Sequence, residues 1–299
     1  MEAFSLTLPY GMTSASYIGR FAPSPTGLLH RGSLAAALAS RLDAHAHGGR
    51  WLVRIEDIDP PRDVPGADRA ILETLRRLGM SWDGDVVWQS RRHEAYEAAF
   101  EALRAKGLVY GCACSRREAQ EAALRSGLPK EVYPGTCRKG TNGRPVRAWR
   151  FAAPEADIGF VDRWMGEFHQ NPARSVGDFV VKRADGLWAY QLAVVVDDIA
   201  GGVTDIVRGA DLLDNTPRQM ALWRALGAEP PRYMHVPLVL NGEGEKLSKQ
   251  QGATPLNPDA LLEELEAAFV HLGFPRINAD STAAFHREAE RLWRERWIG

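Results

Sequence analysis

The stretch RFAPSPTGLLHRGS, residues 20–33, decides the fold. An apolar run, 17–21, leads into it, and an Ala/Leu-rich segment with helical spacing follows it. We predict a strand, a rigid turn and a helix, because Pro23 and Pro25 fix φ while the glycines let backbone approach a ligand. A helix that begins near Gly32 would aim free N–H groups and its positive dipole end at the turn. That arrangement suits a phosphate.

Strand and helix patterns alternate along the chain at the lengths of crossover connections. Leu34, Leu38 and Leu42, for example, repeat every four residues and mark one apolar helix face, which Gly48 ends. This rhythm predicts an α/β fold, a Rossmann-like doubly wound parallel sheet. The further predicted elements are strands 51–55, 86–90, 189–196 and 232–240, and helices 67–78, 96–107, 216–226 and 255–272.

Composition sets limits on the class of protein. The 299 residues are 45% hydrophobic and 25% charged, which is typical of a globular protein with one main domain that carries insertions. The net charge of −1 neither supports nor excludes RNA binding, so any such contact must come from a local basic face. No secretion signal and no apolar run near 18 residues occur. We therefore expect a cytoplasmic protein with no membrane contact.

Polar side chains follow two of the predicted strands. Glu56 ends one strand and is a functional candidate, because ligands bind at the carboxyl ends of strands in open α/β sheets. Asp57 and Asp59 are better explained as the start of a turn before two prolines. Tyr190 and Arg208 would reach the same edge, where an arginine can hold a carboxylate in a bidentate manner. Core packing for Tyr190 and a structural salt bridge for Arg208 are equally open.

Between residues 111 and 150 the rhythm stops, and we predict an insertion between the halves of the sheet. Cys112, Cys114 and Cys137 offer three thiolates, a set that favours zinc in a reducing compartment. No histidine lies nearby to complete the site, and Tyr133 could supply a phenolate oxygen. The alternative is three small buried thiols.

The segment Lys246-Leu247-Ser248-Lys249-Gln250 carries two lysines between glycines. A lysine on such a loop can close over a polyphosphate and stabilise the charge that develops as pyrophosphate leaves. A solvated basic loop is the simpler explanation of this segment alone.

Taken together, these elements carry a resemblance. His30-x-Gly32 behind Pro-Ser-Pro-Thr-Gly resembles the "HIGH" element of class I aminoacyl-tRNA synthetases, and the lysine loop resembles their "KMSKS" element. With Arg54-Ile55-Glu56-Asp57 and Asp197-Asp198-Ile199, the likeness to the glutamyl/glutaminyl group covers about residues 18–250. Ser33 and Gln250 depart from the ideal motifs. Because only 49 residues follow the loop, we expect no anticodon-binding region, and in this the chain resembles the glutamyl-Q tRNA(Asp) synthetase family.

The resemblance implies tRNA-independent activation of L-glutamate with ATP and Mg²⁺, then transfer to the queuosine base of tRNA(Asp) by a monomer with structural Zn²⁺. It implies a glutamate pocket of Arg20, Phe21, Ala22, Pro23, Ser24, Glu56, Tyr190 and Arg208. It implies ATP contacts from His30, Gly32, Lys246, Ser248 and Lys249, with His30, Gly32 and Lys249 catalytic. The zinc ligands would be Cys112, Cys114, Tyr133 and Cys137.

The same likeness suggests a division of the chain. Residues 16–110 and 151–240 would form the two halves of the catalytic domain, 111–150 the zinc-binding insertion, and 241–299 the lysine loop with a short helical C-terminal region. Two competing functions stay open. One is a truncated glutamyl-tRNA synthetase that charges the tRNA 3′ end, and the other is a catalytically inactive RNA-binding paralogue.

Overall fold

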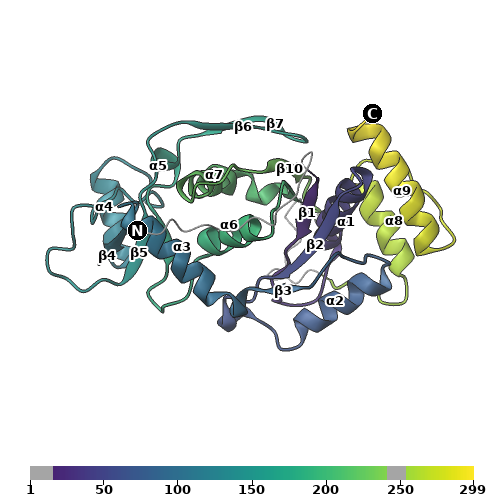
Figure 1. Cartoon of the computed structure of the whole chain (residues 1–299), viewed down its shortest axis with the longest axis horizontal. Coiled ribbons are helices and arrows are strands. Elements are labelled where there is room, and N and C mark those ends of the chain that lie inside the picture. The colour runs from purple at the N-terminus through teal and green to yellow at the C-terminus, as the bar shows by residue number, and fades with distance from the viewer. Residues whose placement is uncertain (1–15, 241–253) are drawn as a thin grey trace.

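The computed structural model of the protein describes residues 16–240 and 254–299. Its centre is a mostly parallel sheet, shown in Figure 1. The strands form two hydrogen-bonded groups: β3 (Val87–Trp88), β2 (Arg50–Ile55) and β1 (Ile18–Phe21) in one, and β9 (Asp205–Gly209), β10 (Arg232–Val236), β6 (Ile158–Asp162) and β7 (Gly166–Gln170) in the other. All neighbouring pairs in these groups are parallel except β6 with β7.

The two groups meet at β1 and β9. The Thr204 N–H donates to the Ile18 carbonyl at 3.0 Å, and the Ile18 N–H donates to the Thr204 hydroxyl at 2.9 Å. Both contacts lie where the strands begin, so the carboxyl ends of β1 and β9 point the same way. The chain therefore reverses its winding between these strands, which is where open α/β sheets bind ligands. The predicted parallel α/β sheet is confirmed.

Residues alternate between two hydrophobic cores along the central strands. Val207 and Met234 belong to one core, whereas their neighbours Ile206 and Tyr233 belong to the other. Successive side chains of a strand point to opposite faces, so the sheet is covered on both sides. The first core contains α1 (Arg31–Ala46), α2 (Ala67–Arg77), α8 (Leu261–His271) and α9 (Thr282–Trp297), and the second contains α3 (His93–Ala105), α6 (Tyr190–Ala200) and α7 (Thr216–Ala225).

A second, antiparallel sheet lies at the other end of the molecule from α8 and α9 (Figure 1). It consists of β4 (Val109–Cys112), β5 (Ala148–Phe151) and β8 (Phe179–Lys182). Cys112 ends β4, and helix α4 (Arg116–Arg125), Cys114 and Cys137 lie in the connection from β4 to β5. Helix α5 (Pro172–Ser175) precedes β8. No described helix is both long and apolar enough to cross a lipid bilayer.

One predicted strand is wrong. The apolar run 189–196 belongs to helix α6, whose residues Leu192 to Ile199 are buried. A short apolar run does not distinguish a buried helix from a buried strand by periodicity, and the three consecutive valines favoured the strand. The segment packs against α3 and α7, and these contacts stabilise the helix. Two other predicted strands, 86–90 and 232–240, are shorter than expected, and helix α8 begins at Leu261.

Candidate active site and cysteine cluster

The residues predicted to bind glutamate come together. A cavity of about 480 Å³ lies at the carboxyl ends of β1, β2 and β9 and at the first turn of α6. Seven of the eight predicted residues line it: Arg20, Phe21, Ala22, Ser24, Glu56, Tyr190 and Arg208. Pro23 does not line it, but its carbonyl accepts the Glu56 N–H at 3.0 Å and so fixes β2 against the turn. We call this cavity the amino-acid pocket.

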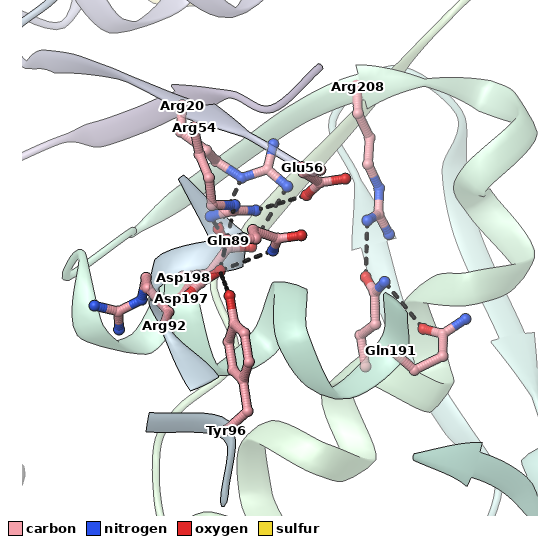
Figure 2. Close-up of polar contacts among 11 residues, drawn as sticks. Arg20, Arg54, Glu56, Gln89, Arg92, Tyr96, Gln191, Asp197, Asp198 and Arg208 are labelled. Atoms are coloured by element: carbon pink, nitrogen blue, oxygen red, sulfur yellow. Dashed lines mark hydrogen bonds and ion pairs between the residues drawn. The ribbon is translucent and has the colours of Figure 1, made fainter. Parts of the chain in front are cut away.

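A buried network of charges connects to the pocket through Arg20 and Glu56, the two of its members that line the pocket (Figure 2). Arg20 donates through Nε to Asp198 at 3.2 Å, and Arg54 donates to the same carboxylate at 2.6 Å. Arg54 also donates to Glu56 at 3.1 Å. Burial raises the pKa of the Glu56 carboxyl, even though Arg54 acts to lower it. An arriving ammonium group would favour the ionised form of this carboxyl.

Helix α6 supplies both aspartates of the network from its last turn. Asp197 accepts from Gln89 and from Tyr96, each at 2.7 Å, and it also pairs with Arg92. These contacts tie the start of α3 to the end of α6. Asp198, the other aspartate, pairs with Arg20. Asp198 is part of a motif quoted from the sequence, but no role was predicted for it.

Arg208 differs from the other buried arginines. Its side chain is 5% exposed and donates only to neutral acceptors: His235 Nε2 at 3.0 Å, Gln219 at 2.7 Å and Thr216 at 2.9 Å, with the Leu212 carbonyl at 3.3 Å. No described carboxylate lies within 4 Å of its guanidinium. The salt bridge considered as an alternative is therefore not present among the described residues. In the view of Figure 2, Arg208 and the arginine–aspartate network lie on opposite sides of Glu56.

Two residues behind Arg208 fix its position. His235 Nδ1 lies 2.6 Å from Asp162, and the His235 backbone N–H donates to the same carboxylate at 3.0 Å. Burial lowers the pKa of the His235 imidazole, and contacts with His235 hold the pKa of Asp162 at about 2 despite its burial. A neutral ring that donates from Nδ1 to Asp162 leaves Nε2 to accept from Arg208. The sequence alone gave no sign of this pair.

His30 closes the start of α1. Its Nδ1 accepts the N–H groups of Gly32 at 3.1 Å and Ser33 at 3.3 Å, and the Ser33 hydroxyl accepts the His30 N–H at 2.8 Å. The expectation that the first turn presents both N–H groups to a phosphate is therefore wrong for Gly32 and Ser33. Because Nδ1 accepts, a neutral ring carries its proton on Nε2, where it can donate to a ligand. Ser33, which replaces a histidine of the ideal motif, completes this cap.

The predicted ATP residues Lys246, Ser248 and Lys249 lie outside the described residues. The chain that follows them returns to the start of α1. The Leu256 N–H donates to the Leu29 carbonyl at 3.0 Å, and Pro255 forms a β-bridge with His30.

Asp57 and Asp59 do not line the amino-acid pocket. Asp57 accepts from Ser90, and Asp59 precedes the 3₁₀ turn Pro60–Arg62, in agreement with the predicted turn.

The three cysteines surround one tyrosine hydroxyl. The sulfur atoms of Cys112, Cys114 and Cys137 all lie within 4.8 Å of one another. The Tyr133 hydroxyl lies 3.3 Å from Cys112 Sγ and 3.5 Å from Cys114 Sγ, and it accepts the Cys137 N–H at 3.1 Å. Burial raises the pKa of the Cys114 thiol to about 11. This donor set could hold a metal ion, because thiolates with one oxygen suit a small tetrahedral site.

Comparison with known proteins agrees with this geometry. Residues 18–268 match the family described as tRNA synthetases class I (E and Q), catalytic domain. The glutamyl-Q tRNA(Asp) synthetase of Bordetella bronchiseptica is 56% identical over 94% of this chain and 90% of its own length. That of Ralstonia nicotianae is 52% identical over 99% of this chain and 98% of its own length. The chain belongs to the glutamyl-Q tRNA(Asp) synthetase family.

Solved structures of longer synthetases share the fold of this chain. The glutamate tRNA ligase of Elizabethkingia meningosepticum, solved with its amino acid, is 29% identical with a TM-score of 0.69. The match covers 79% of this chain but only 52% of that one, so the chain spans about half the length of the ligase. The methionyl-tRNA synthetase of Mycobacterium tuberculosis, 16% identical with a TM-score of 0.53, shares the fold.

Proposed function

We propose that the chain activates L-glutamate with ATP, without tRNA, and transfers the glutamyl group to the queuosine base of tRNA(Asp). Relatives that carry this activity in their names match the chain over nearly their whole length. The observation that carries the choice of amino acid is Arg208, a buried cation whose described partners are all neutral.

Charge balance explains the preference for glutamate. Around the pocket, three arginines face three buried carboxylates: Arg20, Arg54 and Arg92 against Glu56, Asp197 and Asp198. Arg62 and Asp211 also line the pocket, but both are exposed and their charges are opposite, so Arg208 leaves one positive charge in excess. Free glutamate carries one ammonium and two carboxylates, so its net charge of −1 cancels the excess, whereas glutamine would leave it. A buried charge without a partner is costly, which gives the pocket its selectivity.

The roles of the individual residues follow from their positions. Arg208 would hold one carboxylate of glutamate, Arg20 would contribute its remaining donors, and Glu56 would hold the α-ammonium. Tyr190 would hydrogen-bond the bound amino acid, while Ser24 and the backbone of 20–23 would line the pocket. The α-carboxylate then attacks the α-phosphorus, pyrophosphate leaves, and the adenylate forms. A nucleophilic group of the modified base would next attack the adenylate carbonyl, with release of AMP.

The ATP site would lie at the start of α1. His30 Nε2–H and Gly32, whose own N–H is engaged by His30 Nδ1, would face the nucleotide, and Lys246, Ser248 and Lys249 would contact its phosphates. Lys249 precedes Pro255, which pairs with His30, by six residues in the sequence, and this short connection supports the assignment. Mg²⁺ would accompany ATP, held mainly by the phosphates.

The cysteine cluster would bind structural Zn²⁺ through Cys112, Cys114, Cys137 and the Tyr133 oxygen. The thiols already converge on this hydroxyl, which supports the assignment. When bound, zinc would keep the thiols deprotonated and fix the segments around β4 and α4. In the proposed division of the chain, residues 111–150 form a zinc-binding insertion. The two halves of the catalytic domain, 16–110 and 151–240, lie on either side of it in the sequence, and the C-terminal region is 241–299.

Transfer of labelled glutamate to purified tRNA(Asp) tests the proposal. We expect glutamate-dependent ATP–pyrophosphate exchange without tRNA, and label transfer only to tRNA(Asp) that contains queuosine. Removal of the terminal adenosine should leave the transfer unchanged. Label that disappears with the terminal adenosine would instead support a truncated glutamyl-tRNA synthetase, and absence of exchange would support an inactive paralogue.

A further inference from the structure

The part of the chain around the cysteines is far more basic than the rest. Residues 111–150 contain nine lysines and arginines but only three glutamates, an excess of six positive charges, whereas the whole chain has a net charge of −1. The local basic face that RNA binding would require is therefore concentrated on one segment.

A cavity of about 610 Å³ opens beside this segment. It lies between α4 and the antiparallel sheet, and we call it the insertion cavity. Its lining includes Arg116, Lys130, Tyr133, Ala148, Arg150 and Val180. The four basic side chains of the lining outnumber its two acidic ones, Glu131 and Asp185. The volume is within the range of sites that enclose a nucleotide-sized molecule.

Cations stand at the rim of the insertion cavity. Arg116 and Lys130 are exposed. Arg116 has no ion pair with a described carboxylate, and the Lys130 ammonium is 3.8 Å from Glu131, a loose surface pair. Neither charge is neutralised by a close contact within the described chain. Both can therefore bind an incoming phosphate.

Part of the cavity lining is apolar, and we call this part the floor. Ala148 and Val180 contribute aliphatic surface. The Arg150 guanidinium lies over the Tyr133 ring, 3.8 Å from its centre, and its Nε is buried without a hydrogen-bond partner among the described residues. The other end of Tyr133 lies among the three thiols. The cysteine cluster thus positions a planar cation against the cavity, and such planes stack on nucleic-acid bases.

Shared lining residues link the insertion cavity to the amino-acid pocket. Arg183 lines both the insertion cavity and a smaller cavity of about 160 Å³. That smaller cavity in turn shares Ser24, Glu56 and Tyr190 with the amino-acid pocket. A polymer whose modified base approached the activated glutamate through the smaller cavity would pass over the insertion cavity with its neighbouring residues.

We propose that the insertion cavity binds one unstacked nucleotide of the RNA loop that carries the modified base. The base would stack on Arg150 above the apolar floor, and its phosphate would contact Arg116 and Lys130. Sequence-specific RNA binding commonly uses single-stranded loops whose bases are splayed out in this way. The inference rests on the proposed function for the identity of the RNA, but the binding itself can be measured without the reaction.

The test uses the full chain and tRNA(Asp), with and without queuosine. The double variant Arg116→Glu/Lys130→Glu should weaken equilibrium tRNA binding at least tenfold. It should also reduce the slope of log K against log salt by about 0.7, the contribution of one single-strand phosphate. Glutamate-dependent pyrophosphate exchange should stay within twofold, because neither side chain lines the amino-acid pocket. Ala184→Trp, which fills the cavity edge without a change of charge, should also weaken binding.

The matched control is Arg117→Glu/Arg125→Glu, an equal change of charge on the same helix at side chains that do not line the cavity. It should change binding less than threefold. Equal losses of tRNA binding in both double variants would show that only the net positive charge of residues 111–150 matters, and this would overturn the proposal. Full tRNA binding by Ala184→Trp would overturn it as well. If wild-type protein binds tRNA through the cavity but transfers no glutamate, the proposed function fails while this inference stands.

Discussion

The amino-acid pocket and the insertion cavity both use arginines, but in opposite ways. In the pocket, Arg20 and Arg54 are buried and paired with Asp198, and only Arg208 lacks an acidic partner among the described residues. At the insertion cavity, Arg116 and Lys130 are exposed and bound weakly or not at all by described carboxylates. The pocket is suited to one small anion, and the cavity to a polyanion that arrives from solution.

This difference separates two tasks in the molecule. A buried, preorganised network orients glutamate for reaction at fixed positions. Exposed cations contribute binding and salt dependence without demanding one geometry. Variants in the pocket should therefore impair activation, and variants around the cysteines should impair transfer to RNA. The following predictions test that separation.

Arg208→Ala should have the largest effect. Loss of the cation leaves a glutamate carboxylate buried without its partner, which costs about 3–5 kcal/mol. We expect kcat/KM for glutamate in pyrophosphate exchange to fall about 1,000-fold, with tRNA binding unchanged. The control is Arg224→Ala, an exposed arginine of α7 outside the pocket. A loss below tenfold for Arg208→Ala would contradict its assigned role.

Cys137→Ser should affect the other region. We expect bound zinc to fall from about one ion per chain to near zero, because structural sites need all their thiolates. Displacement of Tyr133 should then disturb Arg150, so transfer to tRNA should fall about 100-fold while exchange falls less than threefold. Elemental analysis and the two assays on one preparation check this. Metal-free wild-type protein with full transfer activity would refute it.

Replacement of the residue behind Arg208 should give a smaller effect. His235→Phe removes the acceptor of the Arg208 Nε–H, a hydrogen bond to a charged group worth about 1.5–3 kcal/mol. We expect KM for glutamate to rise about tenfold to one hundredfold with little change in kcat. His235→Gln, which offers an amide oxygen at a similar reach, should recover part of the loss. Equal effects of both variants on kcat and KM would indicate general damage to the fold.

The smallest effect concerns pH. Burial raises the pKa of the Glu56 carboxyl above its usual value, so the free enzyme should lose affinity for the ammonium of glutamate as pH falls through that raised pKa. The acid limb of kcat/KM should therefore lie above pH 4.5 and be absent from Glu56→Gln. At neutral pH this variant should lose about tenfold in kcat/KM. An identical acid limb in both proteins would exclude Glu56 as the titrating group.

Much of this site could be predicted from the sequence because its residues flank strands of strong local pattern. Glu56 follows an apolar run, and the position of such a residue in an α/β sheet follows from the strand direction alone. Arg20 lies within β1, and its role was implied by the family resemblance. Tyr190 lines the pocket, but not for the predicted reason. As the first residue of helix α6 it lies at the carboxyl ends of the strands, whereas the first residue of a parallel strand would lie at the opposite edge.

The supporting residues could not be predicted. Asp162 and His235 lie 73 residues apart in β6 and β10, and nothing local in either segment marks a polar contact. Their pairing depends on the parallel register between these strands, which is a tertiary property. The capping role of His30 was missed for a different reason. Cap residues are typically serine, threonine, aspartate or asparagine, so a histidine gives no such signal.

The position of the glutamyl group on the product RNA is the most direct test of the account. Queuosine-containing tRNA(Asp) would be reacted with ¹³C-labelled glutamate and ATP, digested under conditions that preserve esters, and its nucleosides separated by mass spectrometry. We predict the glutamyl mass on the queuosine nucleoside alone. Glutamate found on the terminal adenosine, or on no nucleoside despite normal pyrophosphate exchange, would contradict the account.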